Sequence, residues 1–395
     1  MRTDRGLGHI VAAELGGRLF PHKIGLVIGT RPEAIKLAPV ARALIASGAN
    51  PHLYATGQHP GLEMAGHGLG GLAVTPLLQP GLPDPLEHAD RVDHALQRVW
   101  RFSPPDLVVV QGDTSSALGG ARAAVACRLP LAHVEAGLRT HDPAMPWPEE
   151  SFRVEIDRLS DLLFAPTPVS AANLMVEHCP GTIHITGNTG VDALLETIGG
   201  RLRKGWLSRH RRQKLLRILV TCHRRENWGE PFAHVADALS ILACDQGVRI
   251  SVVLHPNPRV SEAMFERLGG RDDISLLPPL SHRAMLDAMV ASDLILSDSG
   301  GVQEEAPTLG IPLLVLRDRT ERPEGVDAGA MRLVGTDRDR IVEAVRLLAS
   351  DRAARTAMAR PVFPYGDGRA APRIAAAMLA WLAQDRGDDR RMLSA

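Results

Sequence analysis

The sequence lacks an excess of charge of either sign. Its 395 residues include 45 Lys and Arg against 45 Asp and Glu, so the formal net charge is zero. A chain without a basic excess has no overall field that would hold nucleic acid or an anionic membrane surface. We therefore expect neither as a partner, and any anionic ligand must be held by a local site.

Cysteine and long apolar runs are also scarce. The cysteines show no CxxC spacing and are too few for a disulfide scaffold, which favours a reducing cytoplasm and predicts no structural metal site. They are Cys127, Cys179, Cys222 and Cys244. No apolar run approaches the roughly 20 residues of a membrane span. Glu14 interrupts the apolar patch near the N-terminus, which argues against a signal peptide, and residues 1–22 are expected to form an extension ahead of the first strand.

From residue 23 onward, short apolar runs alternate with longer segments rich in Ala and Leu. This alternation predicts parallel βαβ units, and the chain length predicts two domains. A polar stretch near residues 201–214 interrupts the pattern, so we expect a hinge region at about 188–212. Helices are predicted at 33–46 and 372–383. The expected strands are 24–29, 53–56, 107–111, 131–135, 162–165 and 183–186, then 216–222, 250–255, 274–277, 294–297, 313–316 and 331–334.

In a doubly wound sheet, ligands bind outside the carboxyl ends of the strands, so the residues that follow each apolar run carry most weight. The segment GTRPEAIK (29–36) follows the first strand and is neither a GxGxxG nor a P-loop pattern, so neither dinucleotide nor Mg-triphosphate binding is indicated. Arg31 and Lys36 near a helix start could hold a phosphate. Alternatively, Arg31 caps the turn and Lys36 is solvated.

Acidic residues follow the next central strands. Asp113 ends an apolar strand and is either a functional carboxylate or a helix N-cap. Glu135 ends the following strand, and a Pro-rich loop then presents Glu149 and Glu150. Three acids at one sheet edge would repel and raise at least one pKa, as acid–base chemistry requires; alternatively, Glu149 and Glu150 form the first turn of a helix. His133 is expected to be structural.

Two more places stand out in the second half. His223 directly follows a strand and is as compatible with a structural as with a catalytic role. Ser299, Gly300 and Gly301 open a helix whose free backbone N–H groups could bind a phosphate or carboxylate. Glu305, one turn further on, could accept hydrogen bonds from a ribose diol. The alternative is a closely packed helix start beside a solvated charged loop.

At these positions the sequence resembles the non-hydrolysing UDP-N-acetylglucosamine 2-epimerase family. Eight collinear blocks carry the resemblance, which runs from about residue 23 to the end. They are GTRPEAIKLAP (29–39), GDT (112–114), HVEAGLRT (133–140), PWPEE (146–150), HRREN (223–227), DSGGVQEEAPTLG (298–310), RDRTERPE (317–324) and PYGDG (364–368).

The resemblance implies an α/β, GT-B-like fold in which two Rossmann-like doubly wound domains face a central cleft. The first domain would comprise residues 23–190 plus a C-terminal helix, 365–386, that crosses back to it; the second would comprise residues 191–364. It further implies a cytoplasmic homodimer that needs no cofactor. This enzyme would convert UDP-GlcNAc reversibly to UDP-ManNAc, a precursor of surface polysaccharides.

Roles from the family carry over to matching positions. The implied catalytic residues are Asp113, Glu135, Glu149 and His223. The implied UDP-binding residues are Arg31, Lys36, Leu280, Met285, Ser299, Gly300, Gly301, Glu305 and Arg322. In the family's mechanism the C2 proton and UDP are eliminated to give 2-acetamidoglucal, and UDP then adds back. Protonation occurs on the opposite face, so two protonic groups are the simplest arrangement.

The sequence departs from the family pattern at two places. Phe152 stands where the family commonly has Asn, and Gln58-His59-Pro60-Gly61 replaces a QHR segment that is followed by Met. Gln58 and His59 would lie at the family's second, allosteric substrate site.

The alternatives to the implied function are a 2-epimerase of another UDP-2-acetamido sugar, a hydrolysing form, a GT-B glycosyltransferase, or a nucleotide-sugar-binding protein without turnover. The four candidate catalytic residues argue against the last.

Overall fold

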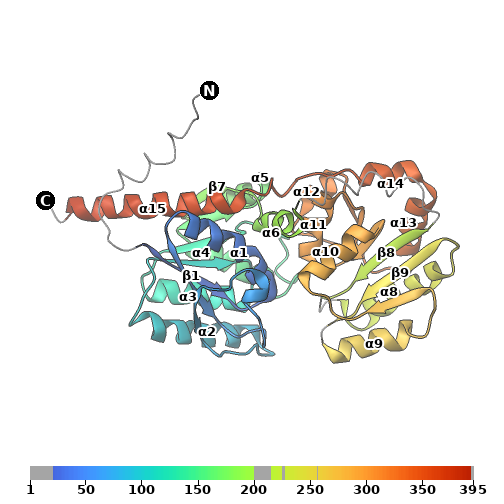
Figure 1. Cartoon of the computed structure of the whole chain (residues 1–395), viewed down its shortest axis with the longest axis horizontal. Coiled ribbons are helices and arrows are strands. Elements are labelled where there is room, and N and C mark those ends of the chain that lie inside the picture. Colours follow the sequence, from blue (N-terminus) through green and yellow to red (C-terminus); the bar gives the residue numbers. More distant parts are fainter. Residues whose placement is uncertain (1–20, 200–214, 225–226, 256, 393–395) are drawn as a thin grey trace, which may run out of the picture.

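The computed structural model of the protein describes residues 21–199, 215–224, 227–255 and 257–392. Strands and helices alternate along these residues and form two groups, one from each half of the chain (Figure 1). Each group builds its own sheet with helices packed on it. The predicted α/β class with two Rossmann-like units is confirmed.

The first sheet has seven parallel strands in the order β3-β2-β1-β4-β5-β6-β7. The strand order reverses between β1 and β4, which is where ligands bind in doubly wound folds. The strands are β1 (Lys23–Ile28), β2 (Asn50–Ala55), β3 (Ala73–Pro76), β4 (Leu107–Gln111), β5 (Leu131–Val134), β6 (Leu162–Ala165) and β7 (Thr182–Ile185).

The second sheet has six parallel strands in the order β10-β9-β8-β11-β12-β13. Its order reverses between β8 and β11, so it repeats the plan of the first sheet. The strands are β8 (Leu216–Thr221), β9 (Val248–Val253), β10 (Ile274–Leu277), β11 (Leu294–Ser297), β12 (Leu313–Val315) and β13 (Met331–Leu333).

The helices of the first half cover both faces of its sheet. They are α1 (Arg31–Ala46), the short η1 (Ala65–His67), α2 (Pro85–Trp100), α3 (Ser115–Ala126), α4 (Glu149–Leu159), α5 (Pro168–Val176) and α6 (Thr189–Ile198). Those of the second half are α8 (Glu230–Ala243), α9 (Pro258–Leu268), α10 (His282–Ala291), α11 (Gly300–Leu309), α12 (Pro323–Asp327), α13 (Arg338–Ser350) and α14 (Arg352–Met358). The chain closes with α15 (Ala370–Met392).

Every strand predicted from the sequence is present, because a strand covered on both faces reads as a short continuous apolar run. In β4 every residue is buried. One strand of the structure, β3, was not predicted from the sequence. It is an edge strand without a buried residue, so it carries no apolar run.

The C-terminal helix α15 packs on the first half of the chain. Ile374, Met378 and Leu382 are buried in the apolar core that contains Leu26 of β1 and Leu37 of α1. Figure 1 shows α15 (red) running along the first group of elements, after the chain has left the second group. Removal of apolar surface from water contributes about 25 cal/mol per Å² and favours the packing of α15 on the first half.

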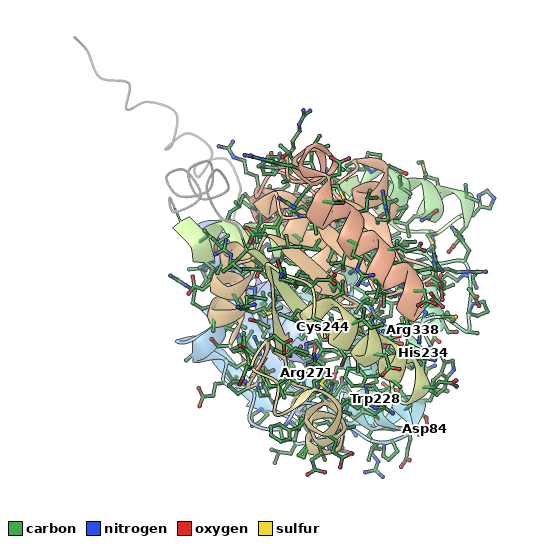
Figure 2. The ribbon with its side chains drawn as sticks, turned by 90° about the vertical axis from the view of Figure 1, so that its right-hand side faces the viewer. Asp84, Trp228, His234, Cys244, Arg271 and Arg338 are labelled. Atoms are coloured by element: carbon green, nitrogen blue, oxygen red, sulfur yellow. The ribbon has the colours of Figure 1, made fainter. Side chains whose placement is uncertain are left out.

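The outer end of the second half is turned toward the viewer in Figure 2. Cys244, Arg271 and Arg338 lie there, at the ends of α8, α9 and α13. No helix of the described residues is both long enough and apolar enough to span a membrane. The predicted N-terminal extension lies outside the described residues except for residues 21 and 22. So do positions 200–212 of the predicted hinge.

Candidate active site

Three turns meet at the carboxyl ends of β1, β4 and β5, because these strands are neighbours in the first sheet. They carry Arg31, Asp113 and Glu135. Asp113 is not the N-cap of the helix that follows, because that position belongs to Thr114, whose hydroxyl accepts a hydrogen bond from the Ala117 N–H. The N-cap interpretation of Asp113 is therefore wrong.

A buried glutamate ties two of these turns together. Glu33 Oε2 accepts hydrogen bonds from the backbone N–H groups of Gly29 (2.8 Å) and Thr30 (2.6 Å). Its Oε1 accepts one from the Thr114 hydroxyl at 2.5 Å. Burial raises the pKa of Glu33. The sequence analysis missed this residue, although Thr30 and Glu33 have the spacing of a capping box.

A buried network of charged side chains joins the two halves. Lys36 Nζ lies 2.6 Å from Glu135 Oε2 and 2.9 Å from Glu304 Oε2. Arg322 Nη2 lies 2.9 Å from Glu135 Oε1 and 2.6 Å from Glu304 Oε1. Gln111 Nε2 also donates to Glu135, at 2.5 Å. Lys36 is buried, so the alternative in which it is solvated is wrong.

The two carboxylates of this network differ in their electrostatics. Burial raises the pKa of Glu135, and the nearby Lys36 offsets only part of that effect. Burial also acts on Glu304, but Arg322 and Lys36 outweigh it and lower the pKa of that carboxyl. Glu135 can therefore hold a proton more readily than Glu304. An entering diphosphate would compete with these carboxylates for Lys36 and Arg322.

A second cluster surrounds Asp113. The Arg153 guanidinium pairs with Asp113 and, at 3.0 Å, with Glu150 Oε2. Glu149 is the first residue of α4, as the helix-turn alternative predicted. Burial raises the pKa of Glu149, and the negative charge of Asp113 raises it further. Glu149 Oε2 is buried and has no hydrogen-bond partner among the described residues, so this oxygen receives no hydrogen bond that would stabilise the ionised form.

Glu150 is committed to structure. Its Oε1 accepts from the backbone N–H groups of Thr140 and His141, each at 2.9 Å, and its Oε2 accepts from Arg153. Of the two adjacent acids, Glu149 is therefore the one that keeps free hydrogen-bonding capacity.

His223 follows β8 in the second sheet and is positioned by a buried carboxylate. Its backbone N–H donates to Asp298 Oδ1 at 2.9 Å, and the Arg224 N–H donates to Asp298 Oδ2 at 2.9 Å. Asn227 Nδ2 adds a third donor at 2.8 Å. Burial lowers the pKa of His223, and the charge of Arg31 across the site lowers it further, although Asp298 opposes this. The imidazole is therefore neutral at physiological pH.

The start of α11 brings backbone N–H groups to the same region. Ser299 is its N-cap, and Gly300 and Gly301 form its first positions. A Cβ on Gly300 would lie 2.8 Å from Arg322 Nη1, so a larger residue there would displace the guanidinium from its present position. The first N–H groups of a helix have no partner within the helix, and a guanidinium beside them makes a site suited to a phosphate.

Arg31 reaches across to the second half. Its Nη1 donates to the backbone oxygen of Leu280 at 2.8 Å. Glu305 lies close enough to raise the pKa of Arg31, but burial outweighs it and the net shift is downward. Glu305 itself pairs with His282 Nε2 at 2.9 Å, a partner that the sequence analysis missed. Met285 is partly buried against the core of the second half.

The residues of the expected allosteric site lie at the carboxyl end of β2. Gln58 Oε1 accepts from the Ser116 hydroxyl at 2.7 Å, and the His59 N–H donates to the Gly29 oxygen at 2.9 Å. Burial lowers the pKa of His59. The departure at Phe152 is explained by packing, because this side chain is buried in the core between the sheet and α2, α3 and α4.

The structure thus brings together the predicted site residues of both halves, with Gln58 and His59 beside the turn after β1. Besides Glu33 and His282, it adds Arg153, Glu304 and Asp298, which the sequence analysis did not select. Each of these three lies within a quoted block or just beyond one, but their partners are distant in sequence. Among the described residues, no group of three or more His, Cys, Asp or Glu side chains is arranged to hold a metal ion.

Comparison with known proteins points to the same family as the sequence blocks. The family model for UDP-N-acetylglucosamine 2-epimerase matches residues 43–379. The UDP-N-acetylglucosamine 2-epimerase of Salmonella typhimurium is 40% identical over 379 residues, covering 91% of this chain and 99% of the relative. That of Escherichia coli K12 is 41% identical over 376 residues, covering 90% and 98%.

Solved structures agree with the sequence relatives. The UDP-GlcNAc 2-epimerase from Neisseria meningitidis bound to UDP-GlcNAc superposes with a TM-score of 0.83 at 35% identity, covering 91% of this chain and all of that one. The Methanocaldococcus jannaschii enzyme in complex with UDP-GlcNAc and UDP gives 0.78 at 31%, covering 91% and 99%. The GT-B-like arrangement is confirmed by these matches. The chain belongs to the UDP-N-acetylglucosamine 2-epimerase family.

Proposed function

We propose that this chain interconverts UDP-GlcNAc and UDP-ManNAc without a cofactor. The observation that carries the proposal is the meeting of three carboxyl groups of the first half with a neutral histidine and a helix start of the second. The carboxyl groups are Asp113, Glu135 and Glu149. The ligand in the Neisseria and Methanocaldococcus structures supports the substrate class.

The reaction proceeds by elimination and re-addition. A carboxylate takes the C2 proton while the C1–O bond breaks, so UDP leaves with the electron pair and a C1–C2 double bond forms in 2-acetamidoglucal. In the return step, a phosphate oxygen attacks C1, and a carboxylic acid on the opposite face delivers a proton to C2. One fixed base cannot serve both faces, so two protonic groups are needed.

The electrostatics of the site divide these tasks. Glu149 and Glu135 both have raised pKa values because they are buried, so either can hold the proton to be delivered. Asp113 is paired with Arg153 and acts as the base. His223, as a neutral imidazole, donates a hydrogen bond to the departing diphosphate.

The UDP moiety is held by groups of both halves. The backbone N–H groups after Ser299, together with Arg31, Lys36 and Arg322, bind the diphosphate. Glu305 accepts from the ribose hydroxyls, and the base lies against Leu280 and Met285. The glycines at positions 300 and 301 allow the phosphate to approach the helix start.

We extend the proposal to the organisation of the chain. Residues 23–190 with 365–386 form one domain, residues 191–364 form the other, and two copies assemble as a cytoplasmic homodimer. The four free cysteines support a reducing compartment. The ManNAc product would supply surface polysaccharide synthesis.

The test is proton NMR of the purified chain with UDP-GlcNAc in D2O, with no metal, nicotinamide or sugar acceptor added. The expected product is UDP-ManNAc with deuterium at C2, because the proton removed from C2 exchanges with solvent before re-addition. Free ManNAc with UDP would show a hydrolysing enzyme instead. An unchanged spectrum would contradict the proposal, and trials with other UDP-2-acetamido sugars and acceptors would separate the remaining alternatives.

A further inference from the structure

Three charged side chains on one face of α4 extend from the candidate active site into the buried interior. Glu149, Arg153 and Asp157 stand at every fourth position of this helix and so lie along one face. The first is a candidate acid, and the second pairs with Asp113. The third is fully buried and takes no part in the chemistry proposed above.

Asp157 pairs with a buried histidine. His133 Nδ1 lies 2.6 Å from Asp157 Oδ1, and His133 Nε2 lies 2.8 Å from the backbone oxygen of Gly112, with both side chains fully buried. The carboxylate of Asp157 and the carbonyl of Gly112 are both acceptors, so the ring of His133 is held between two acceptors. His133 thereby links α4 to the residue that immediately precedes Asp113.

The second oxygen of Asp157 holds the other turn. Asp157 Oδ2 accepts from the Gly137 N–H at 3.1 Å and from Arg139 Nη2 at 2.8 Å. Arg139 is fixed in turn by Glu177 at 2.7 Å. Burial alone would raise the pKa of Asp157, but His133 and Arg139 together lower it, so the carboxylate stays ionised. Gly137 is two residues beyond Glu135.

The turns that contact His133 and Asp157 contain backbone conformations in the left-handed region. Gly112 has φ 69°, Glu135 has φ 74° and Gly137 has φ 82°. For a residue with a Cβ, the left-handed region costs about 1–2 kcal/mol, so Glu135 keeps it only where surrounding contacts impose it. The contacts that His133 and Asp157 make on either side of these positions supply that constraint.

We propose that His133 and Asp157 are positioning residues that set the relative placement of Asp113, Glu135 and Glu149. The inference rests on the proposed function of these three carboxyl groups. Neither His133 nor Asp157 reaches the substrate; they act through the Gly112 carbonyl, the Gly137 N–H and the axis of α4. A displacement of about 1 Å at a reacting group can cost about 100-fold in rate.

The kinetic test uses His133→Gln, Asp157→Asn and the double variant. We expect kcat for UDP-GlcNAc to fall about 10- to 100-fold in each single variant. KM and the Kd for UDP measured by calorimetry should stay close to the parent values. The double variant should lose little more than one single variant, because residues that act as a unit are not additive.

The matched control is Asp293→Asn. Asp293 is also buried and accepts from an arginine side chain and a backbone N–H, both of Arg217, but it stands at the amino end of β11, on the sheet edge opposite the site. It should lower the melting temperature without changing kcat. The positioning role is overturned if kcat of the His133 and Asp157 variants stays at the parent value. It is also overturned if kcat falls only in proportion to a loss of folded protein, as in the control.

A second measurement needs no change in activity. In the ¹⁵N-histidine-labelled parent, one imidazole should show a slowly exchanging Nε2–H signal, which disappears in His133→Gln. A His133 ring whose Nε2 carries no hydrogen would overturn the link to Gly112. If the parent binds UDP but does not turn over UDP-GlcNAc, the proposed function fails, whereas the NMR spectrum still decides whether the His133 link exists.

Discussion

Two aspartates occupy equivalent places in the two sheets but stand in different surroundings. Asp113 follows β4, the neighbour of β1, and Asp298 follows β11, the neighbour of β8. Asp298 is fully buried, and donors from residues 223, 224 and 227 occupy its oxygens. Asp113 has its ion pair with Arg153 and keeps a side chain that is 27% exposed.

The same fold therefore holds one aspartate fully buried and hydrogen-bonded and leaves the other partly exposed. The same residue type at the same sheet edge is structural where its hydrogen-bonding capacity is filled and is available for chemistry where capacity remains. In the second half, the filled carboxylate presents His223 and the start of α11. In the first half, the carboxylate itself faces the site. In the function that we propose, the first half supplies the groups for proton transfer, and both halves bind the diphosphate.

The largest effect is expected from exchanging each aspartate for asparagine. Asp113→Asn removes the base while keeping the shape of the side chain, so kcat should fall about 10²- to 10⁴-fold with little change in the free energy of unfolding. Asp298→Asn leaves buried N–H donors poorly paired and should lower the free energy of unfolding by about 1–3 kcal/mol. Turnover of UDP-GlcNAc and urea denaturation measure the two effects.

The turnover and stability of the two variants together test the contrast between Asp113 and Asp298. If Asp113→Asn keeps near-normal turnover, that residue leaves the mechanism. If Asp298→Asn is as stable as the parent and as inactive as Asp113→Asn, then Asp298 is part of the chemistry and the contrast between the halves is lost.

The sequence predicted the parts of the site that depend on local pattern. Parallel strands buried on both faces read as apolar runs, and the residue after each run lies at the ligand-binding edge. Asp113, Glu135 and His223 could be selected in this way. The structured turn of Thr30 and Glu33 carried a local signal too, but the sequence analysis did not use it.

The rest could not be predicted because it depends on pairs that are far apart in sequence. Lys36 meets Glu304, which is 268 positions away, and no local spacing indicates the contact. Asp157 appears as an ordinary acidic residue near the end of a helix until His133 is placed beside it. The edge strand β3 has no buried residue and therefore lacks the apolar run by which strands are recognised.

The next largest effect should come from the charges between the halves. Glu304→Gln leaves Lys36 with Glu135 as its one carboxylate partner in the network and removes one of the carboxylates that pair with Arg322. Loss of one partner from a buried network costs about 3–5 kcal/mol. We expect a lower free energy of unfolding in urea without UDP. Part of it should return when UDP is added, because the diphosphate supplies the missing negative charge. UDP should also bind more tightly than to the parent.

The matched control is Arg319→Gln. Arg319 pairs with Asp142 across the halves at 3.1 Å, with side chains that are 59% and 27% exposed. An exposed pair contributes about 0–1 kcal/mol, so this variant should be close to the parent with or without UDP. Equal effects of the two substitutions would show that burial of the network does not govern its contribution.

The smallest effect is a difference in pH dependence between two buried carboxyls, Glu149 of α4 and Glu304 of α11. Glu149 has a folded-state pKa above the ordinary 4.5, so it contributes stability that is complete below pH 4.5 and is lost as pH rises through the raised value. Glu304 has a folded-state pKa below 4.5, so it contributes stability that is present above pH 4.5 and is lost as pH falls.

Glutamine cannot ionise, so each variant removes one of these trends. From pH 4.5 upward, Glu149→Gln should gain stability relative to the parent, whereas Glu304→Gln should lose it, and urea denaturation across the range measures both. A parallel response of the two variants would contradict the raised pKa of Glu149 or the lowered pKa of Glu304. Opposite responses would support both directions, because a non-ionising side chain stabilises the fold only where the folded state raises the pKa of the carboxyl that it replaces.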